Sequence, residues 1–149
     1  MENITALHSF PIWLPQTQTW MYSQVAELQR LGLDVHVVCE RIENPDQFRV
    51  ANIHCLADEP KWRQILDKSQ RFLGMRQYLN HTVAVGQKIG AQIVHSHFGH
   101  IGWRNLGAAR RLSAKHIVTF YGLDVNKLPI QFPRWGRRYR KLFPGADFI

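Results

Sequence analysis

Short apolar runs alternate along the chain with stretches in which apolar residues recur at helical spacing. The apolar runs predict five β-strands, over residues 4–10, 35–39, 49–56, 92–97 and 115–120. The helical spacing predicts helices over residues 18–31 and 102–113, and a long helical region over 62–89 that Gly74 or Gly86 could break or kink. Strands that alternate with helices in this way are typical of α/β folds. We therefore predict a doubly wound, mostly parallel, Rossmann-like sheet with helices on both of its faces.

Two later segments do not continue this alternation. Residues 125–134 show neither period and are predicted to form a surface loop. Residues 144–149 are predicted to form a turn and then the first residues of a further strand. Because a natural domain rarely ends within a strand, we expect residues 1–149 to be a single N-terminal domain of a longer protein, with the C-terminal domain absent.

The composition excludes several classes of protein. The chain has 149 residues, of which 45% are hydrophobic and 20% charged, as in one globular domain with its own core. These values exclude a disordered chain and a coiled coil. No run of about 18 apolar residues is present, and the polar first residues do not form a signal peptide. Cys39 and Cys55 each lie in an apolar run, which favours reduced core thiols in a cytosolic protein.

The net charge of +8 is unevenly distributed. Residues 1–60 carry three basic and eight acidic side chains, whereas residues 61–149 carry 16 basic and three acidic ones. A basic half of this kind favours a polyanionic partner, such as nucleic acid, an anionic membrane surface or a phosphorylated substrate. Within it, residues 135–143 predict a basic amphipathic helix. This helix could lie on an anionic membrane, hold phosphates, or pack its apolar face into the core, which is the usual role of such a face.

Ligands bind beyond the carboxyl ends of the strands in an open α/β sheet. This rule selects three polar segments that follow predicted strands, residues 9–19, 95–102 and 120–124. The first segment lacks the Gly-x-Gly-x-x-Gly pattern of a dinucleotide cradle. Its Thr17 or Thr19 could cap the helix that follows, or the helix start could face an anion.

The second segment contains three histidines, His95, His97 and His100. No carboxylate or thiolate lies near them in the sequence to complete a zinc site, so we expect no metal there. Alternation along a strand places His95 and His97 on the same face of the sheet. One of them could line a polar cleft as a hydrogen-bond donor or base, or both could be structural.

The third segment ends in Gly122 and Asp124. Gly122 permits a sharp turn off the strand. Asp124 could act as a general base, bind a substrate hydroxyl, or cap the next turn, and the residues alone leave these alternatives open.

Taken together, these segments resemble the N-terminal domain of GT-B fold glycosyltransferases of family 4, which are retaining enzymes. The most specific part is a strand ending in His95-Ser96-His97-Phe98-Gly99, followed later by Thr119-Phe120-Tyr121-Gly122-Leu123-Asp124. This combination looks most like the transferases that build bacterial exopolysaccharides such as colanic acid. The resemblance also covers Leu14-Pro15, the helix at 18–31, residues 32–38 and residues 143–149.

The resemblance implies a division of labour between two domains. The N-terminal domain binds the acceptor, a second domain binds the nucleotide-sugar, which is a co-substrate, and the reaction occurs in the cleft between them. No other cofactor is implied. The chain is then the acceptor-binding half of a transferase that moves a sugar onto a lipid-linked or polysaccharide acceptor, and it is inactive by itself. We expect it in the cytoplasm, at the inner face of the cell membrane.

Candidate site residues follow from this resemblance and from the basic helix. The expected catalytic residues are His97, Tyr121 and Asp124. The expected substrate-binding residues are Gln16, Thr17, Phe98, Gly99, Gly122, Arg137 and Arg138. The sequence departs from the family pattern twice. Gln16-Thr17-Gln18 stands where many members have Gly-Gly, and Tyr121 stands where many have histidine.

Two other functions stay open. A sugar-nucleotide epimerase has the same two-domain architecture, so the chain could be half of such an enzyme. A non-catalytic α/β module could bind polyanions through the basic helix. The sequence contains no recognised nucleic-acid motif, so we expect no nucleic-acid partner.

Overall fold

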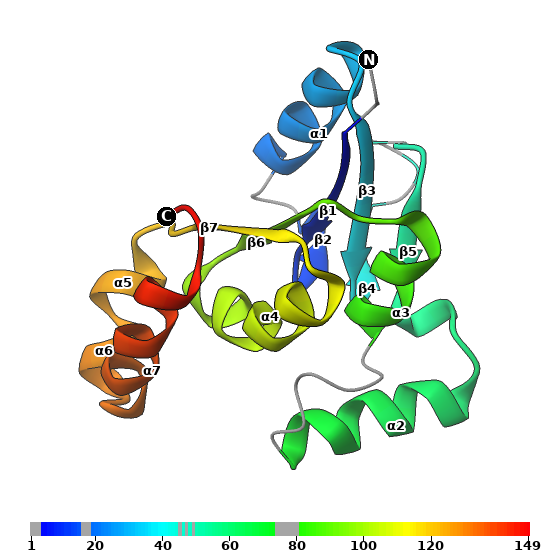
Figure 1. Ribbon diagram of the computed structural model, residues 1–149. Coiled ribbons are helices and arrows are strands. Elements are labelled where there is room, and N and C mark those ends of the chain that lie inside the picture. The colour runs from blue at the N-terminus through cyan, green and yellow to red at the C-terminus, as the bar shows by residue number, and fades with distance from the viewer. Residues whose placement is uncertain (1–3, 16–18, 45, 47, 49, 74–80) are drawn as a thin grey trace.

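The computed structural model describes residues 4–149 with the exception of 16–18, 45, 47, 49 and 74–80. Strands and helices alternate over most of it (Figure 1). The strands are β1 (Thr5–Ser9), β2 (Ile12–Trp13), β3 (Asp34–Cys39), β4 (Arg41–Ile42), β5 (Ile53–Cys55), β6 (Ile93–His97) and β7 (Lys115–Thr119). The helices are α1 (Trp20–Arg30), α2 (Lys61–Phe72), α3 (His81–Ile89), α4 (Gly99–Leu112), α5 (Leu123–Asn126), α6 (Leu128–Gln131) and α7 (Arg134–Leu142), with short 3-10 turns η1 (Leu56–Asp58) and η2 (Phe143–Gly145).

Five strands form one parallel sheet in the order β5-β3-β1-β6-β7. The chain starts at β1, extends the sheet through β3 to β5, and then returns to add β6 and β7 on the other side. This is the doubly wound order. The predicted Rossmann-like α/β fold is therefore confirmed. A second parallel sheet pairs β2 with β4, and the sequence pattern does not reveal it because each strand has only two residues.

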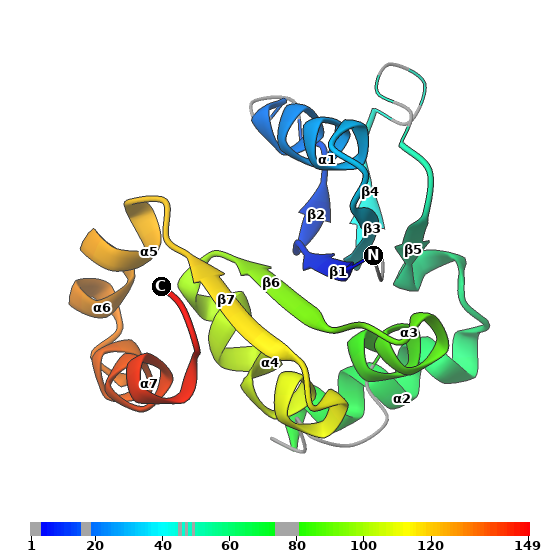
Figure 2. The same ribbon diagram turned by 45° about the horizontal axis from the view of Figure 1, so that its top comes forward.

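Successive residues of the central strands project to opposite faces of the sheet. Val37 of β3 packs on one face in a cluster that includes Val25 of α1. Val38, the next residue, packs on the other face with Leu7 of β1 and Val85 of α3. Figure 2 shows the resulting layers, with α1 on one side of the sheet and α3 and α4 on the other. Helices therefore cover both faces, as predicted.

The basic amphipathic helix predicted at residues 135–143 is α7. Its Tyr139 and Leu142 are buried in a cluster with Leu106 of α4 and Val118 of β7. The apolar face of α7 is therefore covered by the domain itself. This confirms core packing as the role of that face.

The regular elements differ from their predicted extents in three places. The long helical region predicted over 62–89 is divided into α2 and α3, and Gly74, one of the two predicted break points, lies with residues 75–80 outside the described residues. The other, Gly86, lies within α3. The strand predicted over 49–56 is shortened to β5, and η1 follows it. The helix predicted from residue 102 begins at Gly99, because a distant side chain binds the Gly99 N–H group.

The prediction of a surface loop over residues 125–134 is wrong. The segment contains the second half of α5, all of α6 and the first residue of α7. Local backbone bonds hold these short helices, such as the bond from the Asn126 N–H group to the Gly122 carbonyl. Leu123 and Ile130 are exposed, so no buried apolar stripe marks the helical period in the sequence.

Two smaller predictions are confirmed. Cys39 and Cys55 are buried free thiols. The segment after α7 forms the turn η2, and Phe148 then makes a parallel bridge to Ile117 at the edge of the sheet.

The position of Leu7 predicts the effect of shortening a core side chain. Leu7 is fully buried in the central strand, so Leu7→Ala should leave a cavity and lower the free energy of unfolding by about 2–5 kcal/mol. Leu31 lies exposed at the end of α1, so Leu31→Ala should cost less than about 0.5 kcal/mol. Urea unfolding followed by circular dichroism measures both, and equal losses would contradict this account of the core.

Candidate functional site

The carboxyl ends of β1, β6 and β7 lie side by side, because the three strands are parallel neighbours. The chain order reverses between β1 and β6, and open α/β sheets bind ligands at such a point. The register pairs His8 with His95 and His97 with Thr119. His8 also pairs with Val37, so these polar side chains gather on the face of the sheet that α1 covers.

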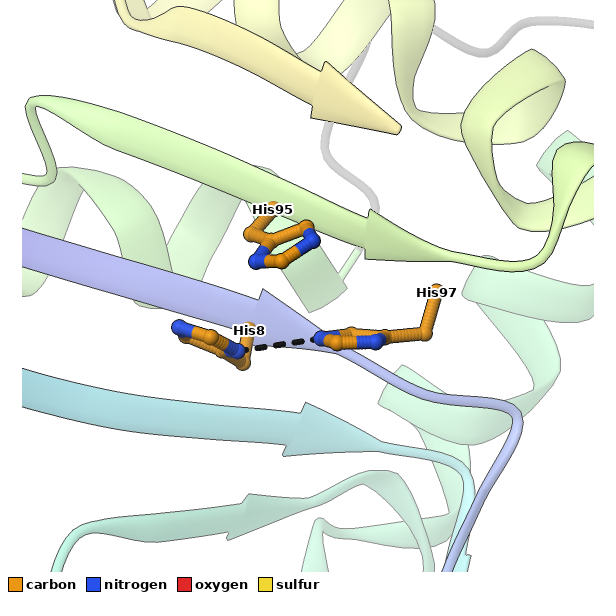
Figure 3. A group of neighbouring side chains, drawn as sticks. All are labelled: His8, His95 and His97. Carbon is orange, nitrogen blue, oxygen red and sulfur yellow. Dashed lines mark hydrogen bonds between the residues drawn. The ribbon is translucent and has the colours of Figure 1, made fainter. Parts of the chain in front are cut away.

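Three imidazoles form the centre of the candidate site (Figure 3). Nδ1 of His8 and Nε2 of His97 share a hydrogen bond of 3.0 Å. The ring of His95 stacks on the ring of His97 with the centroids 4.2 Å apart. The other partner of His95 is the Thr119 hydroxyl, whose oxygen lies 2.8 Å from Nε2. His8 and His97 are almost completely buried, and His95 is partly buried.

Burial lowers the pKa of each imidazole in this cluster. Desolvation, with a smaller contribution from His95, lowers the pKa of His8 to about 3. Desolvation also lowers the pKa of His95 to about 4. For His97, burial and then the two neighbouring imidazoles hold the pKa far below its ordinary value. At pH 7 the cluster is therefore neutral, and each ring offers one donor and one acceptor nitrogen.

Tyr121 connects the cluster to the surface. Its phenol oxygen lies 2.7 Å from Nδ1 of His97, and its ring centroid lies 4.4 Å from that of Trp20. Burial raises the pKa of Tyr121 to about 12, so the phenol keeps its proton at neutral pH. Tyr121 is partly exposed whereas His97 is fully buried. Tyr121 is therefore the member of this pair that a ligand can reach.

Two proton arrangements satisfy both hydrogen bonds of His97. In the first, the phenol of Tyr121 donates to Nδ1 of His97, and the Nε2–H group of His97 donates to Nδ1 of His8. In the second, the Nδ1–H group of His8 donates to His97, and the Nδ1–H group of His97 donates to the phenol oxygen. The phenol proton is then free to bind a ligand. Tyr121 can thus accept a hydrogen bond from a ligand in one arrangement and donate one in the other.

Asp124 joins the two loops that follow β6 and β7. Its buried carboxylate accepts a hydrogen bond of 2.6 Å from the N–H group of Gly99 and one of 2.9 Å from the N–H group of Tyr121. A carboxylate at the N-terminus of α4 also complements the helix dipole. Asp124 therefore holds the His97 segment and Tyr121 in register. It also occupies a backbone donor that a phosphate could otherwise use at this helix start.

The same two loops are unusually tight. Gly122 has φ +87° and Phe98 has φ +75°, a region that residues with side chains rarely adopt. A Cβ atom on Gly99 would lie 2.0 Å from the ring of Phe120, so only glycine fits there. The backbone of Phe98 brings its ring to 4.9 Å from the ring of Tyr121, measured between centroids. An uncommon conformation at such a place is typical of a functional site.

An ion network lies beside these strand ends. Glu40, directly after β3, accepts hydrogen bonds from Arg71 of α2 and Arg104 of α4. Arg71 also pairs with the buried Asp67, at 2.5 Å. Burial by itself would raise the pKa of the Glu40 carboxyl, but Arg104 and Arg71 outweigh burial and hold that pKa below its ordinary value. The network therefore ties α2 and α4 to the end of the sheet.

A basic hollow opens next to this network, between α2, α4 and α7. The residues that line it are Arg71, His100, Trp103, Arg104, Trp135 and Arg138. The guanidinium of Arg138 lies 4.6 Å from the ring centroid of Trp135, which is a cation–π contact. Arg137 is exposed on the same helix.

The structure brings most of the predicted site residues together. The group at the strand ends consists of His97, Phe98, Gly99, Tyr121, Gly122 and Asp124. Arg138 lies at the adjacent hollow and Arg137 on the surface of α7. Gln16 and Thr17 lie outside the described residues.

Several members of the site do not follow from the sequence pattern. His8 appears there only as part of the first strand, because its contact with His97 depends on the register between β1 and β6. A polar residue so near the end of an apolar strand is the signal that could have selected it. Trp20 and the Glu40 network carry no comparable local signal.

The three imidazoles also have to be considered as metal ligands, since their ring nitrogens lie within 4.8 Å of one another. His8 completes this group, not His100, which contacts Phe98 instead. Both nitrogens of His97 and one of His95 face protein partners. The rings of His95 and His97 are stacked, so their lone pairs do not converge on one point. A metal ion would require these rings to rotate and their hydrogen bonds to break.

A comparison with protein families gives the family. The model described as Glycosyltransferase Family 4 matches residues 17–149, which is most of the chain. The chain belongs to glycosyltransferase family 4.

Comparisons with individual proteins are more distant. No curated protein matches this family 4 domain in sequence. Among solved structures, a proposed UDP-N-acetylglucosamine 2-epimerase from Listeria monocytogenes is similar, with a TM-score of 0.62 and 16% sequence identity. The match covers 99% of this chain and 38% of the epimerase chain. At this identity the similarity shows the fold alone, and the domain spans well under half of that protein's length.

The buried imidazoles predict a loss of stability in acid. Between pH about 6.5 and about 4 the unfolded chain binds protons that His95 in the folded domain does not, so stability falls as the pH falls through this window. For His95 the loss should reach about 3 kcal/mol. Urea unfolding across this pH range measures the loss, and His95→Gln should make the curve less steep, while His8 and His97 continue to contribute. A variant with the same pH dependence as the wild type would refute this assignment.

The two hydrogen bonds of Asp124 predict a second effect on stability. Asp124→Asn keeps one acceptor oxygen, now of a carboxamide, and turns the NH2 group toward a backbone donor, so it should lower the free energy of unfolding by about 1–3 kcal/mol. The amide NMR signals of Gly99 and Tyr121 should also shift. Asp58 is exposed, so Asp58→Asn is the matched control and should change little. A variant as stable as this control would contradict the joining role of Asp124.

Proposed function

We propose that this family 4 domain is the acceptor-side half of a retaining glycosyltransferase, which moves a sugar from a nucleotide-sugar onto a glycan or lipid-linked acceptor. The observation that carries the proposal is the partly exposed phenol of Tyr121, hydrogen-bonded to a buried neutral imidazole at the reversal point of the sheet. A neutral group that can both donate and accept a hydrogen bond suits recognition of sugar hydroxyls.

Tyr121 is the member of the predicted catalytic set that touches substrate in this proposal. His97 is fully buried, so it acts as a positioning residue that sets the direction of the Tyr121 hydroxyl. Asp124 is a positioning residue as well, since both of its oxygens are bound by backbone donors. The rings of Trp20 and Phe98 lie around Tyr121 and give the site an aromatic wall. Sites for organic ligands are commonly built from such apolar walls and a few polar groups.

The phosphates of the substrates have a separate place in this proposal. Gly99, at the start of α4, already donates its N–H group to Asp124, which favours the hollow with Arg138 and Arg104 as the phosphate site. Arg138 has no acidic partner among the described residues, and a guanidinium can bind a phosphate with two parallel hydrogen bonds. A lipid-linked diphosphate acceptor, met at the inner face of the cell membrane in the cytoplasm, would use such a group.

A sugar-nucleotide epimerase is the second candidate, because the solved structure similar to this domain is named as one. The two functions differ in what they consume. An epimerase converts a nucleotide-sugar without an acceptor, whereas a transferase releases the nucleotide only when an acceptor is present.

Tyr121→Phe tests the proposal. The ring and its contacts stay, and only the hydroxyl is lost. We expect the affinity for a glycan acceptor to fall about 5- to 10-fold, as for one lost hydrogen bond. Titration of the isotope-labelled chain with oligosaccharides, with and without UDP-sugars, measures this by NMR. The amides of Gly99, Tyr121 and Gly122 should respond.

Tyr22→Phe is the matched control. Tyr22, on α1, is also partly buried, but its ring packs against Phe48. It should bind the acceptor as the wild type does. Sugar transfer is assayed after fusion to a donor-binding domain of a family 4 enzyme. Equal binding by Tyr121→Phe and the wild type would overturn the proposed site. Conversion of the UDP-sugar without an acceptor would favour the epimerase.

A further inference from the structure

The helix α2 turns its apolar side toward solvent. Trp62, Ile65 and Phe72 are 62%, 64% and 91% exposed, whereas Asp67 and Gln70 are buried. An amphipathic helix in a globular domain normally buries its apolar face and exposes its polar one. The orientation of α2 is therefore the reverse of the usual one. Figure 1 shows α2 at the lower edge of the molecule.

Polar contacts hold α2 in this orientation. Asp67 accepts a hydrogen bond of 2.7 Å from the N–H group of His81, the first residue of α3. It also pairs with Arg71, and Arg71 in turn pairs with Glu40 beside the sheet. Rotation of the helix to bury its apolar side would break this partly buried ion network. The exposed apolar face is thus a fixed feature of the domain.

Basic residues border the apolar face of α2. On the helix, Lys61 and Lys68 lie on one side of the apolar stripe and Arg63 on the other, and all three are exposed. The guanidinium of Arg63 lies 5.2 Å from the ring centroid of Trp62. The one acidic residue within α2, Asp67, faces the domain. Lysine is depleted in protein–protein interfaces, whereas lysine and arginine beside tryptophan and phenylalanine are typical of helices that lie on anionic membranes.

We propose that α2 docks this domain on an anionic lipid surface, with Trp62, Ile65 and Phe72 among the acyl chains and the lysines at the headgroups. In the described part of the chain, no helix is long and apolar enough to cross a bilayer. The contact is interfacial, because only one side of α2 is apolar and exposed while its other side packs on the domain. α7, which the charge pattern singles out, cannot supply it, because its apolar face packs in the core. The inference rests on α2 alone and does not depend on the proposed transferase activity.

Co-sedimentation of the full chain with phosphatidylcholine vesicles, with and without phosphatidylglycerol, tests this docking. The wild type should bind the anionic vesicles at least about 10-fold more strongly than the neutral ones. The variant Trp62→Gln/Ile65→Gln/Phe72→Gln should lose at least about 10-fold of that affinity. Lys61→Gln/Lys68→Gln should lose roughly 10- to 30-fold. All of these side chains are exposed, so urea unfolding should show a folded domain in each variant.

Arg140→Gln/Lys141→Gln is the matched control, since it removes the same charge from exposed positions of α7. Its affinity for anionic vesicles should fall less than about 3-fold.

An equal loss of affinity in this control would show general electrostatic adsorption and overturn the role of α2. Equal binding to neutral and anionic vesicles, or no binding, would also overturn it. A dimer in ultracentrifugation that the apolar variant dissociates, without lipid binding, would assign the face to a second copy of the chain. Because the Tyr121 titration uses no vesicles, failure of either proposal can be recognised separately.

Discussion

The carboxylate of Asp124 accepts backbone hydrogen bonds from two loops that follow different strands. Because it is buried, water cannot replace either partner, and removing one would leave a buried polar group unsatisfied. The start of α4, the backbone of Phe98 and the position of Tyr121 all depend on this link. The three residues that the family resemblance groups as catalytic are thus physically joined. Asp124 holds the frame in which His97 and Tyr121 meet.

Burial gives the histidine cluster its chemical character. Imidazoles in water are near their titration point at neutral pH, but those of His8, His95 and His97 are kept neutral because the charged form cannot be solvated in the sheet. Neutral rings have both a donor and an acceptor, so they can form a continuous chain of hydrogen bonds up to the phenol of Tyr121. A protonated His97 would donate through both ring nitrogens, so the phenol of Tyr121 could only accept a hydrogen bond from it. Stability in acid and the direction of the hydrogen bond between His97 and Tyr121 therefore depend on the same burial.

The two basic amphipathic helices, α2 and α7, show how packing decides which side of a helix reaches solvent. Both combine aromatic and basic residues in the sequence. The apolar side of α7 covers the end of α4 and the edge strand β7, so that only its charges reach solvent. The polar side of α2 is held by Glu40 and His81, so that its apolar residues reach solvent. The same kind of pattern therefore produces a core helix in one place and an exposed apolar face in another.

The amino-acid pattern alone is enough to predict the alternation of strands and helices, the doubly wound sheet and the strand ends at which His97, Tyr121 and Asp124 lie. These features follow from the local period of apolar residues and from the rule that parallel strands end at one edge. The packing of distant segments brings His8 to His97, 89 residues away, and lets Glu40 join α2 to Arg104, 64 residues away from Glu40. Packing also sets which side of α2 faces outward, and residues 125–134 fold into helices without a buried stripe. The physical reason is that hydrophobic periodicity is a local property, whereas the partner of a polar group depends on register and packing between distant segments.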